Sequence, residues 1–264
     1  MSPEVLGLQQ TNQEGWLYSS RIEIPISNDG PFLAFAMTWT PIMTNQQNLP
    51  TFFLRGSTDG INWMAPEKIQ RTAHGPSSIF TEYSTLQLLD AQFTTLQIQV
   101  YFPPNSAAIA PDFHLHFFNP GWSTPSIPTP VVDSPESVGE LCSCSPPVVL
   151  ERDDWCPTGN CPADNTPTPT TISHLIVHHS ATANGVGDWP AVVRSIWDFH
   201  VNVWGWDDIG YNWLIDPNGQ LYEGRGQSIQ GAHFCGNNSG TTGVCLLGTF
   251  DVAPPSGAAQ STLQ

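Results

Sequence analysis

The chain has 264 residues, and 7 Lys or Arg stand against 23 Asp or Glu, which gives a formal net charge of -16. Binding to nucleic acid or to an anionic membrane surface requires clustered cations, so this charge balance excludes both as partners. No apolar stretch is long enough to span a bilayer. The length accommodates one or two domains, each with a core of its own.

Composition indicates a secreted, strand-rich protein. Charged residues make up only 11%, whereas the chain has 25 Pro, 22 Gly and 10 Trp, and this combination favours strands and loops over cytosolic helices. Six cysteines agree with an extracellular location. The first ten residues, MSPEVLGLQQ, have no basic segment followed by an apolar one, so a signal peptide is absent, removed or outside this sequence.

The spacing of the cysteines leaves their pairing open. Cys156 and Cys161 flank a Pro-Thr-Gly-Asn turn in DDWCPTGNCP and are placed to close a small loop, but sequence does not rank the pairings that six cysteines allow. No repeated C-x-x-C occurs, which excludes a four-cysteine zinc site.

Residues 1–120 are predicted to form an all-β sandwich domain. Short segments with apolar and polar residues in alternation are separated by Asn, Asp, Gly and Pro, as antiparallel strands require. The Asp-Gly turn in LRGSTDGINW predicts a hairpin that leads to Trp63. His114 and His116 share one face of a strand, but no third metal ligand lies near them in sequence. The expected strands are RIEIPI, FLAFAMTW, TFFLRGS, STLQLLD, TTLQIQVYF and FHLHFF.

Residues 121–148 are predicted to be a linker between two domains. This segment is rich in Pro and Ser, contains acidic residues and shows little periodic hydrophobicity, which is typical of a semi-extended connection.

In residues 149–264 the sequence pattern changes from strands alone to strands interleaved with a helix, which predicts a mixed α/β domain. A strand over about 173–178 precedes Asp188 and Pro190, which mark the start of a helix. YNWLIDPNGQLYEG reads as two strands around the Asn218-Gly219 turn, and TGVCLLGTF adds another strand. The helix is indicated by apolar residues at helical spacing up to Gly205, namely Val193, Ile196 and Trp197 together with His200.

The segment LIVHHSATANG ends the first of these strands with two adjacent histidines. Leu175, Ile176 and Val177 form a continuous apolar run, which predicts a strand that is covered on both faces. Successive residues of a strand point to opposite faces, so His178 and His179 are expected to meet different surroundings.

Reactive side chains gather near the predicted strand ends of this domain. They are His178, Tyr211, Glu223, Arg225 and His233. The chain has no G-x-S-x-G nucleophile elbow and no H-E-x-x-H helix. The chemistry that remains is zinc held by ligands on several strand ends, with a phenol beside it.

Five motifs in order carry a family resemblance. VVLERDDWCP, LIVHHSATANG, IWDFHVNVWGWDDIGYNWLIDPNGQLYEGRG, GAHFCGNNSGTTGVCLLGTF and the Pro-rich turn after them resemble the zinc-dependent N-acetylmuramoyl-L-alanine amidases, a family that includes phage amidases and peptidoglycan recognition proteins. The resemblance covers about residues 149–264. The GSTDGINW stretch of the first domain is similar to accessory sandwiches that precede such amidases.

The resemblance implies a role for each reactive residue. His178 corresponds to a zinc ligand, and His179 becomes a supporting residue at the substrate side. Tyr211 corresponds to a tyrosine that borders the metal-bound water and the scissile carbonyl. His233 lines the substrate cleft, and Arg225 either binds a muropeptide carboxylate or forms an ion pair within YEGRG.

The implied reaction cleaves the amide between the lactyl group of N-acetylmuramic acid and L-alanine. Zinc with three protein ligands and one open position lowers the pKa of its bound water to ~7 and polarises the amide carbonyl. Peptidoglycan and its muropeptides are the expected partners. The alternatives are a recognition protein that binds muropeptides without hydrolysing them and an adhesive sandwich with a vestigial second domain.

The end of the sequence departs from the family pattern. The family's other two zinc ligands, a His and a Cys or Asp, follow a further helix, whereas this sequence ends at PPSGAAQSTLQ without a later histidine. We therefore expect a domain that is incomplete at its C-terminus and an inactive, poorly soluble chain. His233 and Cys235 are the alternative ligands.

Overall fold

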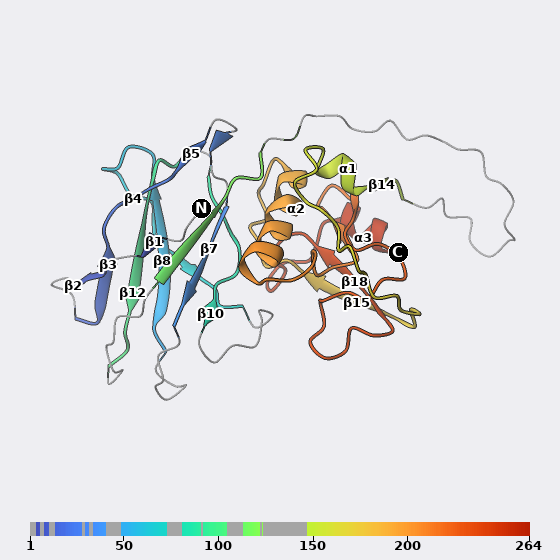
Figure 1. Cartoon of the computed structure of the whole chain (residues 1–264). Helices are drawn as coiled ribbons and strands as arrows, with labels where there is room; N and C mark the ends of the chain where they lie inside the picture. The colour runs from blue at the N-terminus through green and yellow to red at the C-terminus, as the bar shows by residue number, and fades with distance from the viewer. Residues whose placement is uncertain are drawn as a thin grey trace, which may run out of the picture. The chain divides into compact units, whose positions relative to one another are not determined.

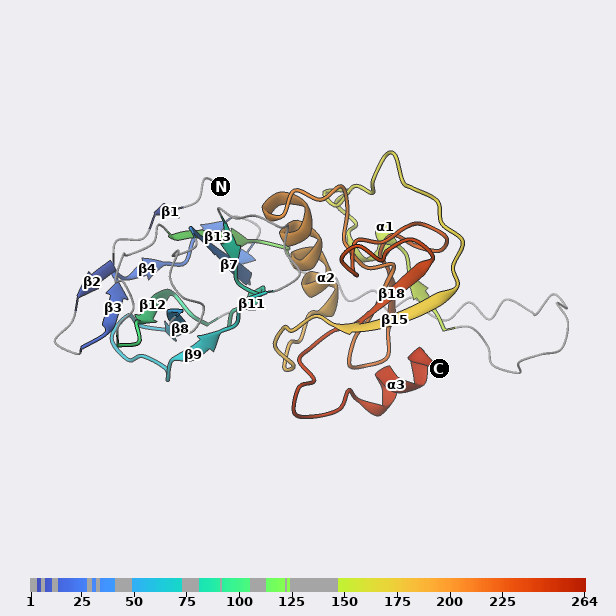
Figure 2. The same ribbon diagram turned by 90° about the horizontal axis from the view of Figure 1, so that it is seen from below.

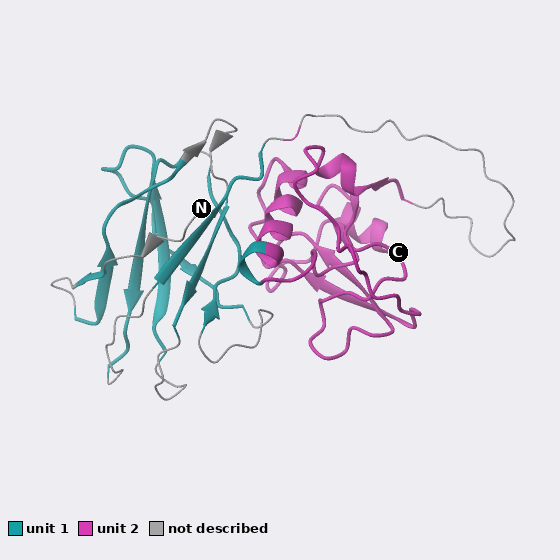
Figure 3. Cartoon of the chain, viewed as in Figure 1, with its two compact units in different colours: residues 1–121, 202–204 teal, residues 122–201, 205–264 magenta. Residues whose placement is uncertain are grey.

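The computed structural model describes residues 4–5, 8–10, 14–27, 30–31, 34–40, 49–72, 81–90, 92–104, 113–121, 123 and 147–264. The chain divides into two compact units, residues 1–121 with 202–204 and residues 122–201 with 205–264 (Figure 3). Most of the predicted linker lies outside the described residues. Among the helices that are described, none has both the length and the apolar character needed to cross a membrane.

The first unit contains two antiparallel sheets (Figure 1). One has the order β1-β13-β7-β10, with β11 beside β7, and the other has the order β2-β3-β12-β8-β9, with β4 beside β12; β5 and β6 form a separate pair. The strands are β1 Glu4–Val5, β2 Leu8–Gln10, β3 Trp16–Ser19, β4 Ile22–Glu23, β5 Ile26–Ser27, β6 Gly30–Pro31, β7 Ala34–Trp39, β8 Thr51–Ser57, β9 Glu67–Ile69, β10 Glu82–Tyr83, β11 Gln87–Leu88, β12 Thr95–Tyr101 and β13 Phe113–Phe118.

The two sheets share one apolar core. Phe52 of β8 stands 4.8 Å from the ring of Trp39 in β7 and 5.3 Å from that of Phe113 in β13, measured between ring centroids. Leu96 and Ile98 of β12 are buried in the same cluster. Alternate residues of β8 and β12 supply the core, and the residues between them point to the opposite face of the sheet. All six residues of β7 are buried.

One of the two histidines of β13 has a hydrogen-bond partner on the neighbouring strand, whereas Nδ1 of the other, His114, is buried without one among the described residues. His116 Nε2 lies 3.0 Å from the hydroxyl of Thr38 on the neighbouring strand, and burial lowers the pKa of His116. His114 pairs in register with Thr38. The part of the chain that the structure describes contains no group of three or more His, Cys, Asp or Glu placed to hold a metal.

The second unit is built on a mixed sheet, as the sequence predicts. Its order is β14-β17-β16-β18-β15, in which β16 and β17 are antiparallel and the other pairs are parallel. Figure 2 shows helices α2 and α3 on either side of β15 and β18. The elements are β14 Val149–Leu150, α1 Arg152–Trp155, β15 His174–His179, α2 Trp189–Asp198, a π-helix over Phe199–Val203, β16 Trp213–Ile215, β17 Leu221–Glu223, β18 Thr241–Leu246 and α3 Gly257–Leu263.

Helix α2 begins where its capping signal predicts. The carboxylate of Asp188 accepts a hydrogen bond from Ala191 N at 3.0 Å, and Pro190 occupies the first turn. Asp188 also accepts hydrogen bonds from the hydroxyl and the main-chain N of Ser123, at 2.6 and 2.8 Å. One aspartate thus fixes the helix start and the chain that enters this unit.

The expectation that β15 is covered on both faces is wrong. Leu175 and Val177 are 53% and 47% exposed, and β15 lies at the end of the sheet order with β18 as its one neighbour among the described strands. The apolar run Leu175–Val177 is therefore explained by the preference of branched residues for extended backbone in an edge strand. It does not indicate a strand that is buried on both faces.

Candidate functional site

Strand register places His178 and His179 on opposite faces of the sheet, as predicted. His178 pairs in parallel register with Cys245 of β18, and His179 pairs with Leu246. Leu246 belongs to the apolar cluster that includes Ala259 of α3. His178 and Cys245 consequently share the face that is turned away from α3.

The structure brings His178 and His233 into direct contact. His178 Nε2 lies 2.9 Å from His233 Nδ1, and the two rings meet edge to face with their centroids 5.0 Å apart. His233 comes from the loop before β18. There Asn238 Oδ1 accepts hydrogen bonds from the main-chain N of His233 and of Phe234, at 2.9 and 2.8 Å, so the loop holds the ring in place.

Two glycines leave room for the His233 ring. A Cβ atom at Gly231 or at Gly243 would lie 2.4 Å from ring atoms of His233, which is closer than side chains tolerate. The GAH motif and the glycine within β18 are thus parts of one cradle for an imidazole that is only 6% exposed.

The environment of His233 keeps its ring uncharged at neutral pH. Burial, together with the neighbouring groups His178 and Arg225, lowers the pKa of His233 to about 4. In the contact between the two rings, one nitrogen donates a hydrogen bond and the other accepts it. His233 Nε2 lies 3.4 Å from the hydroxyl of Thr241.

Tyr211 faces the same site from the loop before β16. Its ring centroid lies 5.7 Å from that of His178 and 5.7 Å from that of His200. Burial raises the pKa of the Tyr211 hydroxyl well above its usual value, and a hydrogen bond with the Cys245 thiol raises it further. Burial also raises the pKa of Cys245. Both groups are therefore protonated at neutral pH, and the phenol is available as a hydrogen-bond donor.

Asn212 is a structural residue of the site that sequence reasoning missed. Its buried amide Nδ2 donates to the carbonyls of Gly226 and Ile229, at 2.9 and 2.7 Å, and its Oδ1 accepts from Gly243 N at 2.9 Å. The signal was the Asn that directly follows Tyr211 in DIGYN. This side chain ties the tyrosine loop to the glycine cradle.

Arg225 donates hydrogen bonds to main-chain carbonyl oxygens. Its Nε donates to Ile209 O at 2.8 Å, and its two terminal nitrogens lie 3.3 Å from Gln230 O and 3.5 Å from Asp208 O. Among the described ion pairs there is none between Arg225 and Glu223, the acid of YEGRG. A role for Arg225 in substrate binding remains a prediction.

His179 supports the loop that follows β18. Its Nδ1 accepts a hydrogen bond from Phe250 N at 3.1 Å, and its Nε2 lies 4.0 Å from a carboxylate oxygen of Asp251. These contacts are those of a supporting residue. Its role at the substrate is also untested.

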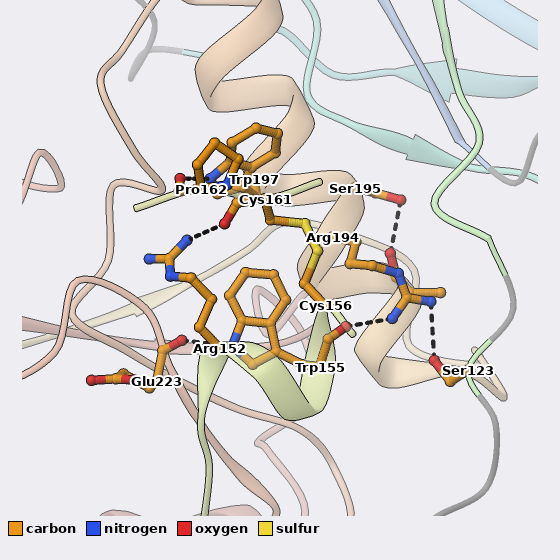
Figure 4. The surroundings of a disulfide bond; sticks show 11 residues. Ser123, Arg152, Trp155, Cys156, Cys161, Pro162, Arg194, Ser195, Trp197 and Glu223 are labelled. Carbon is orange, nitrogen blue, oxygen red and sulfur yellow. Dashed lines mark hydrogen bonds between the residues drawn. A yellow bond between two sulfur atoms is a disulfide. The ribbon is translucent and has the colours of Figure 1, made fainter. Parts of the chain in front are cut away.

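A disulfide and the side chain of Arg152 lie close together in the second unit (Figure 4). Cys156 and Cys161 are bonded to each other, so the short loop between them is closed. Arg152 donates to Cys161 O at 3.1 Å, to Gly224 O at 2.7 Å and to the carboxylate of Asp208 at 2.8 Å. Asp208 is buried three residues before Tyr211, so this network positions the loop that carries the phenol.

The alternative zinc ligands do not complete a metal site in the described residues. Cys235 is an exposed free thiol, and no three His, Cys, Asp or Glu side chains of the described residues are placed together to hold a metal ion. The described residues offer two imidazoles in contact.

Three comparisons place the second unit among known proteins. Residues 168–264 match the family model of N-acetylmuramoyl-L-alanine amidase. Peptidoglycan recognition protein 3 of Homo sapiens is 36% identical over 120 residues, which is 45% of this chain and 34% of that protein. The N-acetylmuramoyl-L-alanine amidase of Sus scrofa is 37% identical over 119 residues, which is 43% of this chain and 19% of that protein.

Solved structures include a similar chain in the crystal structure of tracheal cytotoxin bound to the ectodomain complex of peptidoglycan recognition proteins LCa and LCx. It is 33% identical, with a TM-score of 0.41 and coverage of 44% of this chain and 71% of that chain. This chain thus spans about a third of the human relative and a smaller part of the pig relative. The matched region, residues 168–264, belongs to the family of N-acetylmuramoyl-L-alanine amidases and peptidoglycan recognition proteins.

Proposed function

We propose that the second unit is a zinc-dependent amidase of peptidoglycan that cleaves the bond between the lactyl group of N-acetylmuramic acid and L-alanine. The observation that carries this proposal is the convergence of His178, Tyr211 and His233 on one face of the mixed sheet. These residues come from three separate segments of the chain, and the sequence predicted all three as site residues.

Tyr211 is the residue that would stabilise the amide oxygen during cleavage without the help of a metal. Its hydroxyl is protonated at neutral pH, and a hydrogen bond from it to the amide oxygen would stabilise the negative charge that develops there. His178 lies beside it and shares a hydrogen bond with His233, whose ring is uncharged at neutral pH.

Zinc was tested against the residues present. When bound, zinc would polarise the amide carbonyl and activate water. A catalytic zinc needs three protein ligands, and within the described residues only the nitrogens of His178 and His233 approach each other, with no third ligand beside them. The described residues therefore do not make a complete zinc site, and their affinity for the metal should be low.

The expected setting is the cell envelope or the extracellular space, where peptidoglycan and its muropeptides are the partners. The Cys156–Cys161 disulfide supports an oxidising location. The name of the human relative, a peptidoglycan recognition protein, and that of the pig relative, an amidase, agree with this partner.

A second candidate is a recognition domain that binds muropeptides without cleaving them. The incomplete set of metal ligands among the described residues favours it. In that case the face around His178 and Tyr211 would serve as a binding surface for the peptide or the lactyl group.

One experiment separates the two candidates. The chain is incubated with a purified muropeptide at increasing zinc concentrations, the release of free peptide is followed by mass spectrometry, and binding is measured by calorimetry. Release that requires added zinc and stops with a chelator would assign the amidase, and it would overturn the expectation that the chain is inactive. Binding without release would assign recognition, and the absence of both would contradict either function.

A further inference from the structure

The outward face of one sheet in the first unit carries a cluster of aromatic side chains. Trp16 and Tyr18 lie on β3, Phe53 lies on β8 and Tyr101 lies on β12. Strand pairing sets Tyr101 opposite Trp16 and Gln99 opposite both Tyr18 and Phe53. We call these four residues the aromatic face.

The four rings form a continuous, partly exposed surface. The ring of Trp16 lies 5.1 Å from Tyr101, 5.5 Å from Phe53 and 6.3 Å from Tyr18, measured between centroids. All four side chains keep part of their surface in contact with solvent. The core of this unit lies on the other side of the sheet, where Phe52, Ile98 and Val100 are buried. Packing of the core therefore does not account for the aromatic face.

The polar residues around the aromatic face carry amides, hydroxyls and two cations, Arg55 of β8 and Lys68 of β9, which pairs with Phe53. The other outward positions of β3, β8 and β12 hold Thr51, Arg55, Ser57, Thr95, Gln97 and Gln99, and none of these positions holds a carboxylate. The outward carboxylate of β4, Glu23, pairs with Thr95 at the opposite end of β12 from Tyr101. The strand positions beside the four rings therefore hold no acidic group in a chain with a net charge of -16, and such a surface is suited to an uncharged ligand.

Arg55 extends the face toward Trp63. Its guanidinium lies 4.8 Å from the ring centroid of Trp63, and Gln97 Oε1 accepts hydrogen bonds from Arg55 Nε and Nη2, at 2.9 and 2.6 Å. Gln97 in turn donates to Ser19 O at 3.0 Å. This chain of hydrogen bonds holds a flat polar group beside the aromatic rings, which reduces the entropy lost when a ligand binds.

Sugar chains have the matching chemistry. One side of a sugar ring presents C–H groups that pack on aromatic rings, and its rim presents hydroxyl and amide groups that hydrogen bond with Gln and Arg side chains. We propose that the aromatic face binds the glycan strand of peptidoglycan and so holds the chain on its polymeric substrate. The choice of this glycan rests on the proposed function of the second unit, whereas the binding of a sugar chain rests on the face itself.

The test measures binding of the full chain to insoluble chitin, a polymer of N-acetylglucosamine, by co-sedimentation. We expect wild type to bind and the variants Tyr18→Ser and Tyr101→Ser to lose about tenfold in affinity each. Tyr83→Ser, which removes a partly exposed tyrosine from the other sheet, is the matched control and should bind as wild type does. Thermal unfolding and release of peptide from a soluble muropeptide should be unchanged in all three variants.

Three results would overturn the proposal. The first is a lack of chitin binding by the wild-type chain, and the second is equal binding by wild type and both tyrosine variants. The third is a dimer, detected by sedimentation velocity, that dissociates in Tyr18→Ser or Tyr101→Ser, since the face would then be an interface between two copies.

If a tyrosine variant unfolds, Tyr101→Phe and Trp16→Phe replace it, and these should retain chitin binding. Failure of the amidase proposal would appear instead as absent peptide release with chitin binding intact.

Discussion

At the scale of single residues, the site depends on groups that are kept neutral by burial. His233 and Tyr211 both have pKa values displaced in the direction that removes charge at neutral pH. A neutral imidazole and a neutral phenol keep their hydrogens for directed hydrogen bonds, and they can face a polar substrate without a counter-ion. Cys245 and the two glycines of the cradle carry no charge either, whereas Arg225 is a charged neighbour that helps to lower the pKa of His233.

Replacing Tyr211 by Phe tests the role of the phenol. If its hydroxyl stabilises developing charge on the amide oxygen, Tyr211→Phe should lower turnover about 10²-fold or more, as expected for loss of one such donor. Affinity for the muropeptide should be unchanged. Cys245→Ala is the matched variant, since it removes the thiol from the Tyr211 hydroxyl but leaves the hydroxyl in place. Equal turnover in Tyr211→Phe and wild type would assign the tyrosine to packing.

His233 should make stability depend on pH. The pKa of His233 is lowered from 6.5 to about 4 on folding. Between pH 4 and pH 6.5, His233 is therefore largely protonated in the unfolded chain and largely neutral in the folded chain. Stability should be intact above pH 6.5 and fall as pH drops toward 4, by about 2 kcal/mol at pH 4.5. Urea unfolding of the metal-free chain at pH 7 and pH 4.5 measures this loss. His233→Gln should lack this part of the pH dependence, and an identical loss in both proteins would contradict the assignment.

At the scale of elements, the sequence predicted what local patterns determine. Alternation along β15 separated His178 from His179, and the Asp188 and Pro190 signals located the start of α2. Burial of Leu175 and Val177 was predicted wrongly because the position of a strand within its sheet depends on distant segments. The contact of His178 with His233 and the links made by Asn212 depend on the same long-range pairing, so spacing alone did not reveal them.

Strand β18 should tolerate no side chain at its glycine. A Cβ atom at Gly243 would lie 2.4 Å from the His233 ring, so Gly243→Ala should force the ring or the strand to move and destabilise the chain by about 1–3 kcal/mol. Gly187→Ala is the control, because nothing lies within 4 Å of the Cβ position there. Thermal unfolding of the two variants compares them directly, and similar melting temperatures would show that the cradle is not tightly packed.

At the scale of the whole molecule, each unit has the parts that independent folding requires. The first has a core of its own between two sheets, and the second has a mixed sheet with an apolar cluster beneath α3 and a disulfide. The predicted roles divide in the same way, with attachment to the glycan in the first unit and amide chemistry in the second. Such a division makes the two roles separable by deletion.

Deleting residues 1–121 should therefore separate the two roles. For the remaining residues 122–264 we expect turnover of a soluble muropeptide within about twofold of the full chain, because His178, Tyr211 and His233 all lie in the part that is kept. On insoluble peptidoglycan the shortened chain should be slower, since a tether raises the effective concentration of the second unit at its substrate by holding it on the polymer. Rates of peptide release on both substrates test this, with circular dichroism to confirm that the shortened chain is folded. Loss of activity on the soluble muropeptide by a folded shortened chain would show that the first unit takes part in the chemistry, and the division of roles would have to be abandoned.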